Sequence, residues 1–218
     1  MSEKWKDRER ERDIYYITPP NVVNFQFINE SLYSSTPHKE SQIMTNIIKV
    51  FFRKHYRMCD ITAIDATAHI GCDTITFMRN FGRVVAVEEN TNTFKILSSN
   101  VKDEQNVKNL TLLNESFLDT LHRLQDISIE YKTTFVYIDA PWGGLDYRYK
   151  SNIDLYLDNI NIIDIADRLL KLVRLVVIKV PKNFNIEYIK KYDKQKFIKQ
   201  DIYRKHKISY VVYYLFKK

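Results

Sequence analysis

The sequence contains little of what several protein classes require. Only two of its 218 residues are cysteines, Cys59 and Cys72, so neither a disulfide framework nor a paired-cysteine metal motif is expected. No apolar run comes near the roughly 18 residues that a membrane-spanning helix needs. Residues 1–12 are charged, unlike a secretory signal. We therefore expect an intracellular protein of a reducing compartment, cytoplasmic or nuclear, with no metal and no membrane partner, and we favour a monomer.

Glycine and proline are also scarce, with four and five residues, while Lys, Ile, Asn and Tyr are abundant. The favoured residues have A/T-rich codons, so we interpret this bias as a property of the genome; a parasite, a protist or a large DNA virus would fit. A chain of 218 residues with 44% apolar content suits one globular domain. The formal charge of +7 suits an anionic partner such as nucleic acid, but a well-solvated surface explains it equally well.

The order of apolar runs predicts the fold. Residues 1–32 are expected to form an N-terminal arm or helical extension, and residues 33–218 the main domain. Thr36 is a plausible N-cap and Pro37 a good first residue for a helix that runs to about His55. The apolar face of that helix is expected to comprise Ile43, Ile47, Val50 and Phe51.

Strands and helices then alternate along the chain. We predict strands at 61–65, 83–88, 110–113, 133–139, 174–180, 197–204 and 208–216. Helices are predicted at 74–80, 91–101, 117–125, 154–171 and briefly around Tyr188. This pattern predicts an α/β, Rossmann-like methyltransferase fold: a mostly parallel seven-stranded sheet with helices on both faces and a C-terminal antiparallel hairpin. Ligands of such open sheets bind at the carboxyl ends of the strands.

Two of the predicted strands end in residues suited to a nucleotide-like ligand. The first ends at Asp65 and is followed by a small-residue turn that contains Gly71 and leads into a helix. Such a turn lets the backbone approach a ligand closely. The second ends at Glu88, and an acidic residue about 20 residues beyond the first turn can accept both hydroxyls of a ribose.

The fourth predicted strand delivers the segment Asp139-Ala140-Pro141-Trp142-Gly143-Gly144. The exocyclic amine of a nucleobase is a poor nucleophile because its lone pair is delocalised into the ring. Hydrogen-bond acceptors on its two hydrogens restore nucleophilicity, and the Asp139 carboxylate and a main-chain carbonyl near Ala140 or Pro141 are candidates. Trp142 offers a flat face for a purine, and a cationic purine gains a cation–π contribution of about 1–2 kcal/mol. Pro141 stiffens the turn, and Gly143 lets the backbone pass close to the base.

Four segments together resemble the trimethylguanosine synthase family, which methylates N2 of 7-methylguanosine in RNA caps with S-adenosylmethionine. They are Tyr33-Ser34-Ser35-Thr36-Pro37, the loop from Asp65-Ala66 to Gly71-Cys72-Asp73-Thr74, Trp142-Gly143-Gly144-Leu145-Asp146-Tyr147, and Val180-Pro181-Lys182-Asn183. They occur in the family's order and span roughly residues 33 to 185. The tryptophan-glycine-glycine element is the most specific of them.

The resemblance implies a set of site residues. The expected cofactor-binding residues are Thr36, Pro37, Asp65, Ala66, His69, Gly71, Asp73, Thr74, Glu88, Glu115 and Ser116. The expected catalytic residues are Asp139, Pro141 and Trp142. A capped RNA or cap nucleotide is expected to contact Ser34, Trp142, Gly143, Tyr147, Lys179, Lys182 and Asn183, with the lysines on its phosphates. A second ring that sandwiches the purine is expected from Trp5, Tyr15, Tyr16 or Tyr147.

The sequence departs from the family's pattern at several positions. His69 and Cys72 replace glycines of the cofactor loop, and a side chain at the first of these positions is expected to crowd or contact the methionine part of the cofactor. Ser116, with Glu115 before it, stands where the family has an acidic residue for the adenine amine. Asp139 replaces a residue that is often serine and makes the segment similar to that of adenine-N6 methyltransferases. Two alternatives to cap guanine-N2 methylation therefore stay open: adenine-N6 methylation of RNA or DNA, and a catalytically inactive cap- or RNA-binding module.

Overall fold

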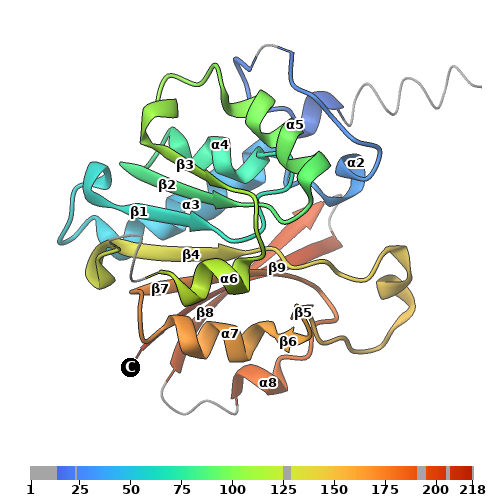
Figure 1. Cartoon of the computed structure of the whole chain (residues 1–218). Helices are drawn as coiled ribbons and strands as arrows, with labels where there is room; N and C mark the ends of the chain where they lie inside the picture. The colour runs from blue at the N-terminus through green and yellow to red at the C-terminus, as the bar shows by residue number, and fades with distance from the viewer. Residues whose placement is uncertain (1–13, 23, 125–128, 191–194, 205–206, 218) are drawn as a thin grey trace, which may run out of the picture.

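A computed structural model describes residues 14–22, 24–124, 129–190, 195–204 and 207–217. The first 13 residues of the expected N-terminal arm, and with them Trp5, lie outside the described ranges. Seven strands form one sheet: β1 (Thr62–Asp65), β2 (Arg83–Val87), β3 (Leu110–Leu113), β4 (Thr134–Ile138), β7 (Leu175–Pro181), β8 (Gln195–Arg204) and β9 (Lys207–Lys217). Their order is β3-β2-β1-β4-β7-β9-β8. Strands β1 to β4 and β7 are parallel, and β9 runs antiparallel to both β7 and β8. The Rossmann-like fold with its C-terminal hairpin is thus confirmed (Figure 1).

Helices cover both faces of the sheet because alternate strand residues point to opposite sides. One apolar cluster joins the sheet to α3 (His38–Phe52), α4 (Cys72–Met78) and α5 (Thr91–Val101), through residues such as Ala63 and Phe135. The other joins it to α6 (Phe117–His122), α7 (Ile162–Leu169) and α8 (Glu187–Lys190), through residues such as Ile64 and Val136. A further short α-helix, α2 (Ser31–Ser34), immediately precedes α3 in the chain.

The structure of α3 contradicts two predictions, one about its buried face and one about its N-cap. Its buried apolar residues are Met44, Ile48 and Phe52, whereas Ile43 and Val50 are 46% and 53% exposed. The predicted face was wrong because the mixed composition of the helix supports more than one stripe at helical spacing, and the sheet selects between them. Pro37, not Thr36, is the N-cap residue, and Thr36 makes no cap hydrogen bond.

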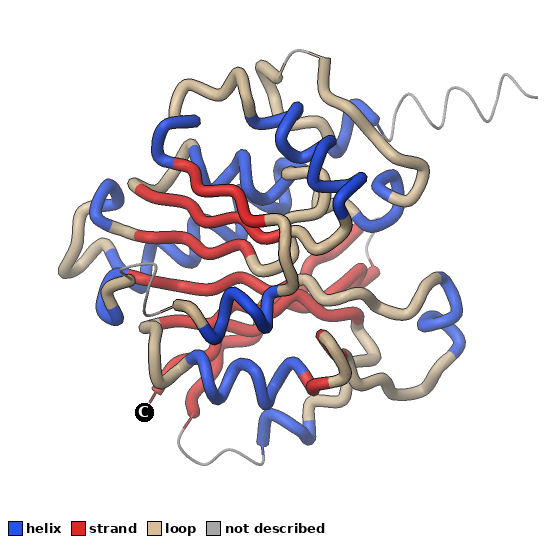
Figure 2. Tube along the Cα trace, in the orientation of Figure 1, coloured by secondary structure: helices blue, strands red, loops and turns tan. Residues whose placement is uncertain are grey.

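The helix predicted at 154–171 is only half as long as expected. Residues Tyr156–Leu157 (β5) and Ile160–Asn161 (β6) pair as a small antiparallel hairpin, and α7 begins after it. The two turn residues, Asp158 and Asn159, have positive φ angles of 45° and 64°. Asp and Asn tolerate this conformation better than most residues, and consecutive positive φ angles favour a tight hairpin. Figure 2 shows that the segment between β4 and α7 is mostly loop.

Candidate active site

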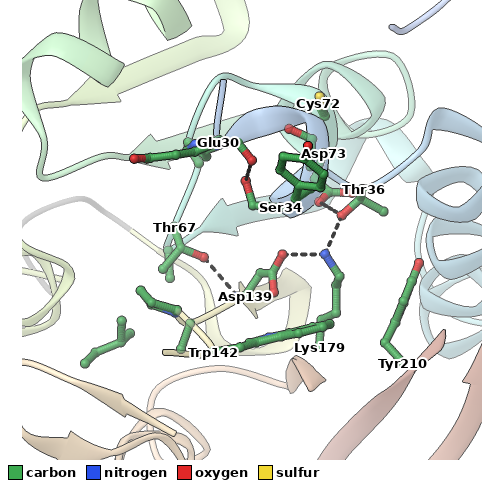
Figure 3. Close-up of a pocket in the computed structure, with 18 of the residues that line it drawn as sticks. Glu30, Ser34, Thr36, Thr67, Cys72, Asp73, Asp139, Trp142, Lys179 and Tyr210 are labelled. Atoms are coloured by element: carbon green, nitrogen blue, oxygen red, sulfur yellow. Dashed lines mark hydrogen bonds and ion pairs between the residues drawn. The ribbon is translucent and has the colours of Figure 1, made fainter. Parts of the chain in front are cut away.

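A cavity of about 850 Å³ lies at the carboxyl ends of the central strands. It takes residues from the loops after β1, β2 and β4, from the end of β7, and from the start of β9 (Figure 3). This is where an open parallel sheet binds its ligand. The predicted site residues that line the cavity are Ser34, Thr36, Ala66, His69, Asp73, Glu88, Asp139, Pro141, Trp142, Tyr147 and Lys179.

The loop between β1 and α4 is held by hydrogen bonds around its buried acidic end. Asp65 accepts a hydrogen bond of 2.6 Å from the Thr74 hydroxyl. Burial, and then the neighbouring Asp73, raise the pKa of Asp65 to about 8. Asp65 and Thr74 do not line the cavity, whereas Ala66 and Asp73 do. Asp65 therefore shapes the loop from behind, while the residues next to it face the space where a ligand binds.

Gly71 is the position in this loop that is least tolerant of a side chain. Its φ is 97°, and a Cβ there would lie 2.9 Å from Leu97 Cδ1. We expect Gly71→Ala to destabilise the protein by about 1–2 kcal/mol, because alanine disfavours this backbone conformation and crowds α5. Chemical denaturation measures the change. Gly143→Ala is the matched control for the contact, since its φ is also positive but a Cβ there meets nothing within 4 Å.

The carboxylate of Glu88 is fixed at the cavity by the backbone on both sides of it. One oxygen accepts from the His69 N–H and the other from the Asn90 N–H, each at 2.9 Å. Burial raises the pKa of Glu88. His69 itself adopts a positive φ of 50°. Burial, and then the Lys179 ammonium, lower the pKa of the His69 imidazole to about 4, so this ring is neutral near pH 7.

A chain of hydrogen bonds crosses the floor of the cavity (Figure 3). The Lys179 ammonium donates to Asp139 Oδ2 at 2.5 Å and to the Thr36 hydroxyl at 2.9 Å. The Thr36 hydroxyl donates onward to Asp73 Oδ2 at 2.6 Å, and Tyr137 donates to the same oxygen at 3.1 Å. Four elements that are distant in sequence are therefore joined: β4, β7, the loop before α3, and α4.

Asp139 lies directly after β4, three residues before Trp142 in the chain. Its backbone N–H donates to the Thr67 hydroxyl at 2.9 Å, which ties the end of β4 to the loop after β1. Burial raises the pKa of the Asp139 carboxyl to about 6, even though the Lys179 ammonium lowers it. At neutral pH Asp139 is therefore mainly a carboxylate, which is a hydrogen-bond acceptor only.

Trp142 stands on the wall of the cavity among other rings. Tyr147 contacts it edge to face, with centroids 5.1 Å apart, and Tyr210 lies 6.5 Å away at a tilt of 55°. Asn183 holds the following turn in place by donating to the carbonyls of Tyr147 and Lys150 at 2.8 and 2.7 Å. Tyr147 thus packs against Trp142 from the side. Tyr15 and Tyr16 do not line the cavity.

Several predicted site residues lie outside the cavity lining, namely Pro37, Asp65, Gly71, Thr74, Glu115, Ser116, Gly143, Lys182 and Asn183. Glu115 pairs with Arg123 and accepts from Thr120, and Ser116 caps α6. Phe117 is the residue of this segment that lines the cavity. The predicted phosphate contact of Lys179 stays a prediction, but its side chain is only 4% exposed and its ammonium is paired with Asp139, which does not favour that contact. Lys182 is exposed, as that role requires.

The structure adds residues that sequence reasoning missed. Tyr210 on β9 and Arg204 on β8 line the cavity, and Arg204 is held by Glu40 through contacts of 2.6 and 2.8 Å. The β5–β6 hairpin contributes Tyr156, Leu157 and Asp158. The Asp158-Asn159 pair between apolar residues is a hairpin signal that could have identified the last group. No local signal distinguishes Tyr210 from the other tyrosines of its strand.

None of the described helices is long and apolar enough to cross a membrane. Within the described ranges, no group of three or more His, Cys, Asp or Glu side chains is arranged to hold a metal ion.

A family model and a viral protein are similar to this chain in sequence. The family model described as RNA cap guanine-N2 methyltransferase matches residues 61–217. An uncharacterized protein of Acanthamoeba polyphaga mimivirus is 27% identical over 134 residues, which are 61% of this chain and 50% of that protein. The chain thus spans about half the length of the curated relative that it matches.

Solved structures share the fold at low sequence identity. An rRNA methylase from Streptococcus thermophilus has a TM-score of 0.52 at 12% identity, over 78% of this chain and 94% of that one. An O-methyltransferase from Bacillus cereus, in complex with SAH, has a TM-score of 0.56 at 11% identity, over 100% of this chain and 92% of that one.

Proposed function

The chain belongs to the RNA cap guanine-N2 methyltransferase family, and from this premise we propose that it methylates the exocyclic N2 amine of a 7-methylguanosine RNA cap. Membership in this family confirms the resemblance that four sequence segments predicted. The methyl donor expected from the sequence, S-adenosylmethionine, is the donor that this family implies. The division into an N-terminal arm of residues 1–32 and a main domain of residues 33–218 stays a prediction, as does the monomeric state.

The residues at the cavity suit the donor. When bound, S-adenosylmethionine supplies an electrophilic methyl group on a sulfonium sulfur. Glu88 presents a fixed carboxylate at the end of β2, where acceptors for ribose hydroxyls are found in such folds. Asp73 Oδ1 is buried with no hydrogen-bond partner among the described residues, so it is suited to accept from the ammonium of the methionine part. His69 borders the same space with a neutral ring.

The observation that carries the proposal is the position of Asp139 and Trp142 in the same cavity as these residues. In the proposed arrangement Trp142 stacks on the purine, and Asp139 accepts a hydrogen bond from the amine. That hydrogen bond keeps the amine lone pair available while the carbon–nitrogen bond forms and the carbon–sulfur bond breaks. The proton of the methylated amine leaves to solvent. Catalysis therefore consists mainly of positioning and of polarising the amine.

A direct assay tests the proposal. The full chain is incubated with labelled S-adenosylmethionine and one acceptor. Separate reactions contain 7-methylguanosine diphosphate, guanosine diphosphate or adenosine as that acceptor. We expect label in the first acceptor and a mass gain of one or two methyl groups. Absence of transfer to every acceptor, together with absence of binding of S-adenosylhomocysteine by calorimetry, would reject an enzyme.

A second candidate is methylation of adenine N6, which Asp139 at the head of its segment favours. Transfer to adenosine in preference to 7-methylguanosine diphosphate selects it. A cap- or RNA-binding module without activity is the third candidate. It differs from both in one measurement, because it binds 7-methylguanosine diphosphate but not S-adenosylhomocysteine.

The donor pocket makes a separate prediction. Glu88→Ala is expected to weaken the binding of S-adenosylhomocysteine by roughly tenfold or more, because two ribose hydroxyls lose a charged acceptor worth about 1.5–3 kcal/mol. Isothermal calorimetry measures it. Glu89→Ala is the matched control, since Glu89 is the adjacent, exposed acidic residue at the rim. Equal loss in both variants would contradict the assignment of Glu88.

A further inference from the structure

Lys179 is a buried cation at the centre of the site whose surroundings fix it from several sides. It lies in β7 and its residue is 3% exposed. Its ammonium donates to Asp139 and to Thr36. It also lies 5.6 Å from the centroid of the Trp142 ring and 5.1 Å from that of Tyr210. Hydrogen bonds and ring faces therefore surround a group that is usually left in water.

Two further buried carboxyl groups lie close to the pair of Lys179 and Asp139. Asp65, at the end of β1, and Asp73, in the first turn of α4, are both buried. Besides burial, like-charge repulsion from Asp73 and Asp139 raises the pKa of Asp65, and repulsion from Asp73 raises the pKa of Asp139. The other described cations of the cavity lining are Arg148 and Arg204, and Glu40 already engages Arg204. Lys179 is thus the cation in direct contact with the Asp139 carboxylate.

We propose that Lys179 is a positioning residue for the amine acceptor: it holds Asp139 as a carboxylate, with Oδ2 engaged and the other oxygen left for the exocyclic amine of the substrate. The inference rests on the proposed function, in which Asp139 is that acceptor. A protonated Asp139 would present a hydroxyl to the amine and would polarise it in the wrong direction. Lys179 acts only through Asp139 and does not bind phosphate.

The pairing also explains how a cation can lie beside a stacking ring. An unpaired ammonium near Trp142 would repel a positively charged purine. Because Lys179 and Asp139 together are neutral, a 7-methylated purine can stack on Trp142 without facing a net positive charge. The pair that accepts the amine carries no net charge, so the same site can also hold a cationic base.

Titration of the carboxyl group tests the proposal without any substrate. The full chain is labelled with ¹³C at aspartate carboxyl groups, and the Asp139 signal is assigned by its loss in Asp139→Asn. In Lys179→Met we expect the Asp139 midpoint to move up by about 1 pH unit or more, the effect of losing an opposite charge at this distance. The described titratable groups that interact electrostatically with Asp139 include, besides Lys179, Asp65, Asp73 and Tyr137. An unchanged midpoint would overturn the proposal.

Kinetics test the consequence for catalysis. For wild type with 7-methylguanosine diphosphate, kcat is expected to rise with pH to a plateau above the Asp139 midpoint. Lys179→Met is expected to lose about half or more of its kcat at pH 7, because a midpoint raised by about 1 unit leaves roughly half of Asp139 protonated there, to recover much of it near pH 9, and to keep its KM. Lys179→Arg, which retains a charge, is expected to keep a midpoint close to that of wild type.

Two controls separate this proposal from the proposed function. Binding of S-adenosylhomocysteine by calorimetry shows that each variant is folded and retains its donor pocket. A loss of kcat in Lys179→Met that is equal at every pH would contradict a role through the charge of Asp139. If wild type methylates none of the acceptors, the proposed function fails, while the carboxyl titration still decides whether Lys179 holds Asp139 ionised.

Discussion

Replacing Asp139 by alanine is expected to lower kcat for methyl transfer by about 10²–10³-fold, the usual loss when one group that stabilises a transition state is removed. The physical reason is the weak nucleophilicity of the base amine, which depends on an acceptor placed within hydrogen-bond reach. The affinity for S-adenosylhomocysteine is expected to change little, because in the proposed arrangement Asp139 contacts the base and not the donor. Steady-state kinetics and calorimetry measure the two quantities.

Asp139→Asn is the matched variant, because its amide oxygen remains an acceptor while its charge is lost. We expect it to retain more activity than Asp139→Ala. Both variants leave Lys179 without its carboxylate partner, so thermal unfolding must be measured alongside. A kcat near that of wild type in folded Asp139→Ala would exclude Asp139 as the acceptor.

Replacing Trp142 by alanine is expected to raise KM for the cap nucleotide by about 10- to 100-fold. Stacking of a base on an aromatic ring is worth roughly 1–3 kcal/mol, and a cationic purine adds to it. The effect on kcat is expected to be smaller, since Trp142 does not contact the amine in the proposed arrangement. Titration of 7-methylguanosine diphosphate against guanosine diphosphate by calorimetry measures both the affinity and the preference for the methylated base.

Two aromatic variants control this experiment. Trp142→Phe keeps a ring and is expected to retain most of the affinity. Tyr149→Ala removes an aromatic side chain from the same loop, but Tyr149 is 88% exposed and does not line the cavity. Equal loss of binding in Tyr149→Ala and Trp142→Ala would mean that the loop, and not the indole ring, determines affinity.

The layout of the fold could be predicted because hydrophobic periodicity is a local signal. The helix Thr91–Val101 and the strand Leu110–Leu113 have the predicted bounds. The segment 154–171 was misassigned because the apolar residues around Asp158-Asn159 fit a helical stripe as well as a hairpin, and pairing of β5 with β6 decides between them. In α3, packing against the sheet determines which apolar stripe is buried, and the residues of the helix alone do not specify it.

Some residues of the candidate site could likewise be predicted from local sequence signals, and others could not. Asp139, Trp142 and Glu88 were identified because each follows an apolar run, and the carboxyl ends of parallel strands meet at one edge of a sheet. Tyr210 was missed because β9 reaches the site only by running antiparallel to β7, where Pro181 pairs with Tyr210.

The sequence by itself determined the α/β fold, the edge of the sheet that carries the site, and the family, since these depend on short segments whose order and spacing are local. Only the tertiary structure decided the surroundings of Lys179, from which its proposed role follows. The sequence presents a lysine one residue from the end of a strand, with a phosphate as its expected partner. The structure buries its ammonium against Asp139 and Thr36, which are 40 and 143 residues away in the chain. Burial and partners at such separations set the charge state of a carboxylate, and no local pattern contains them.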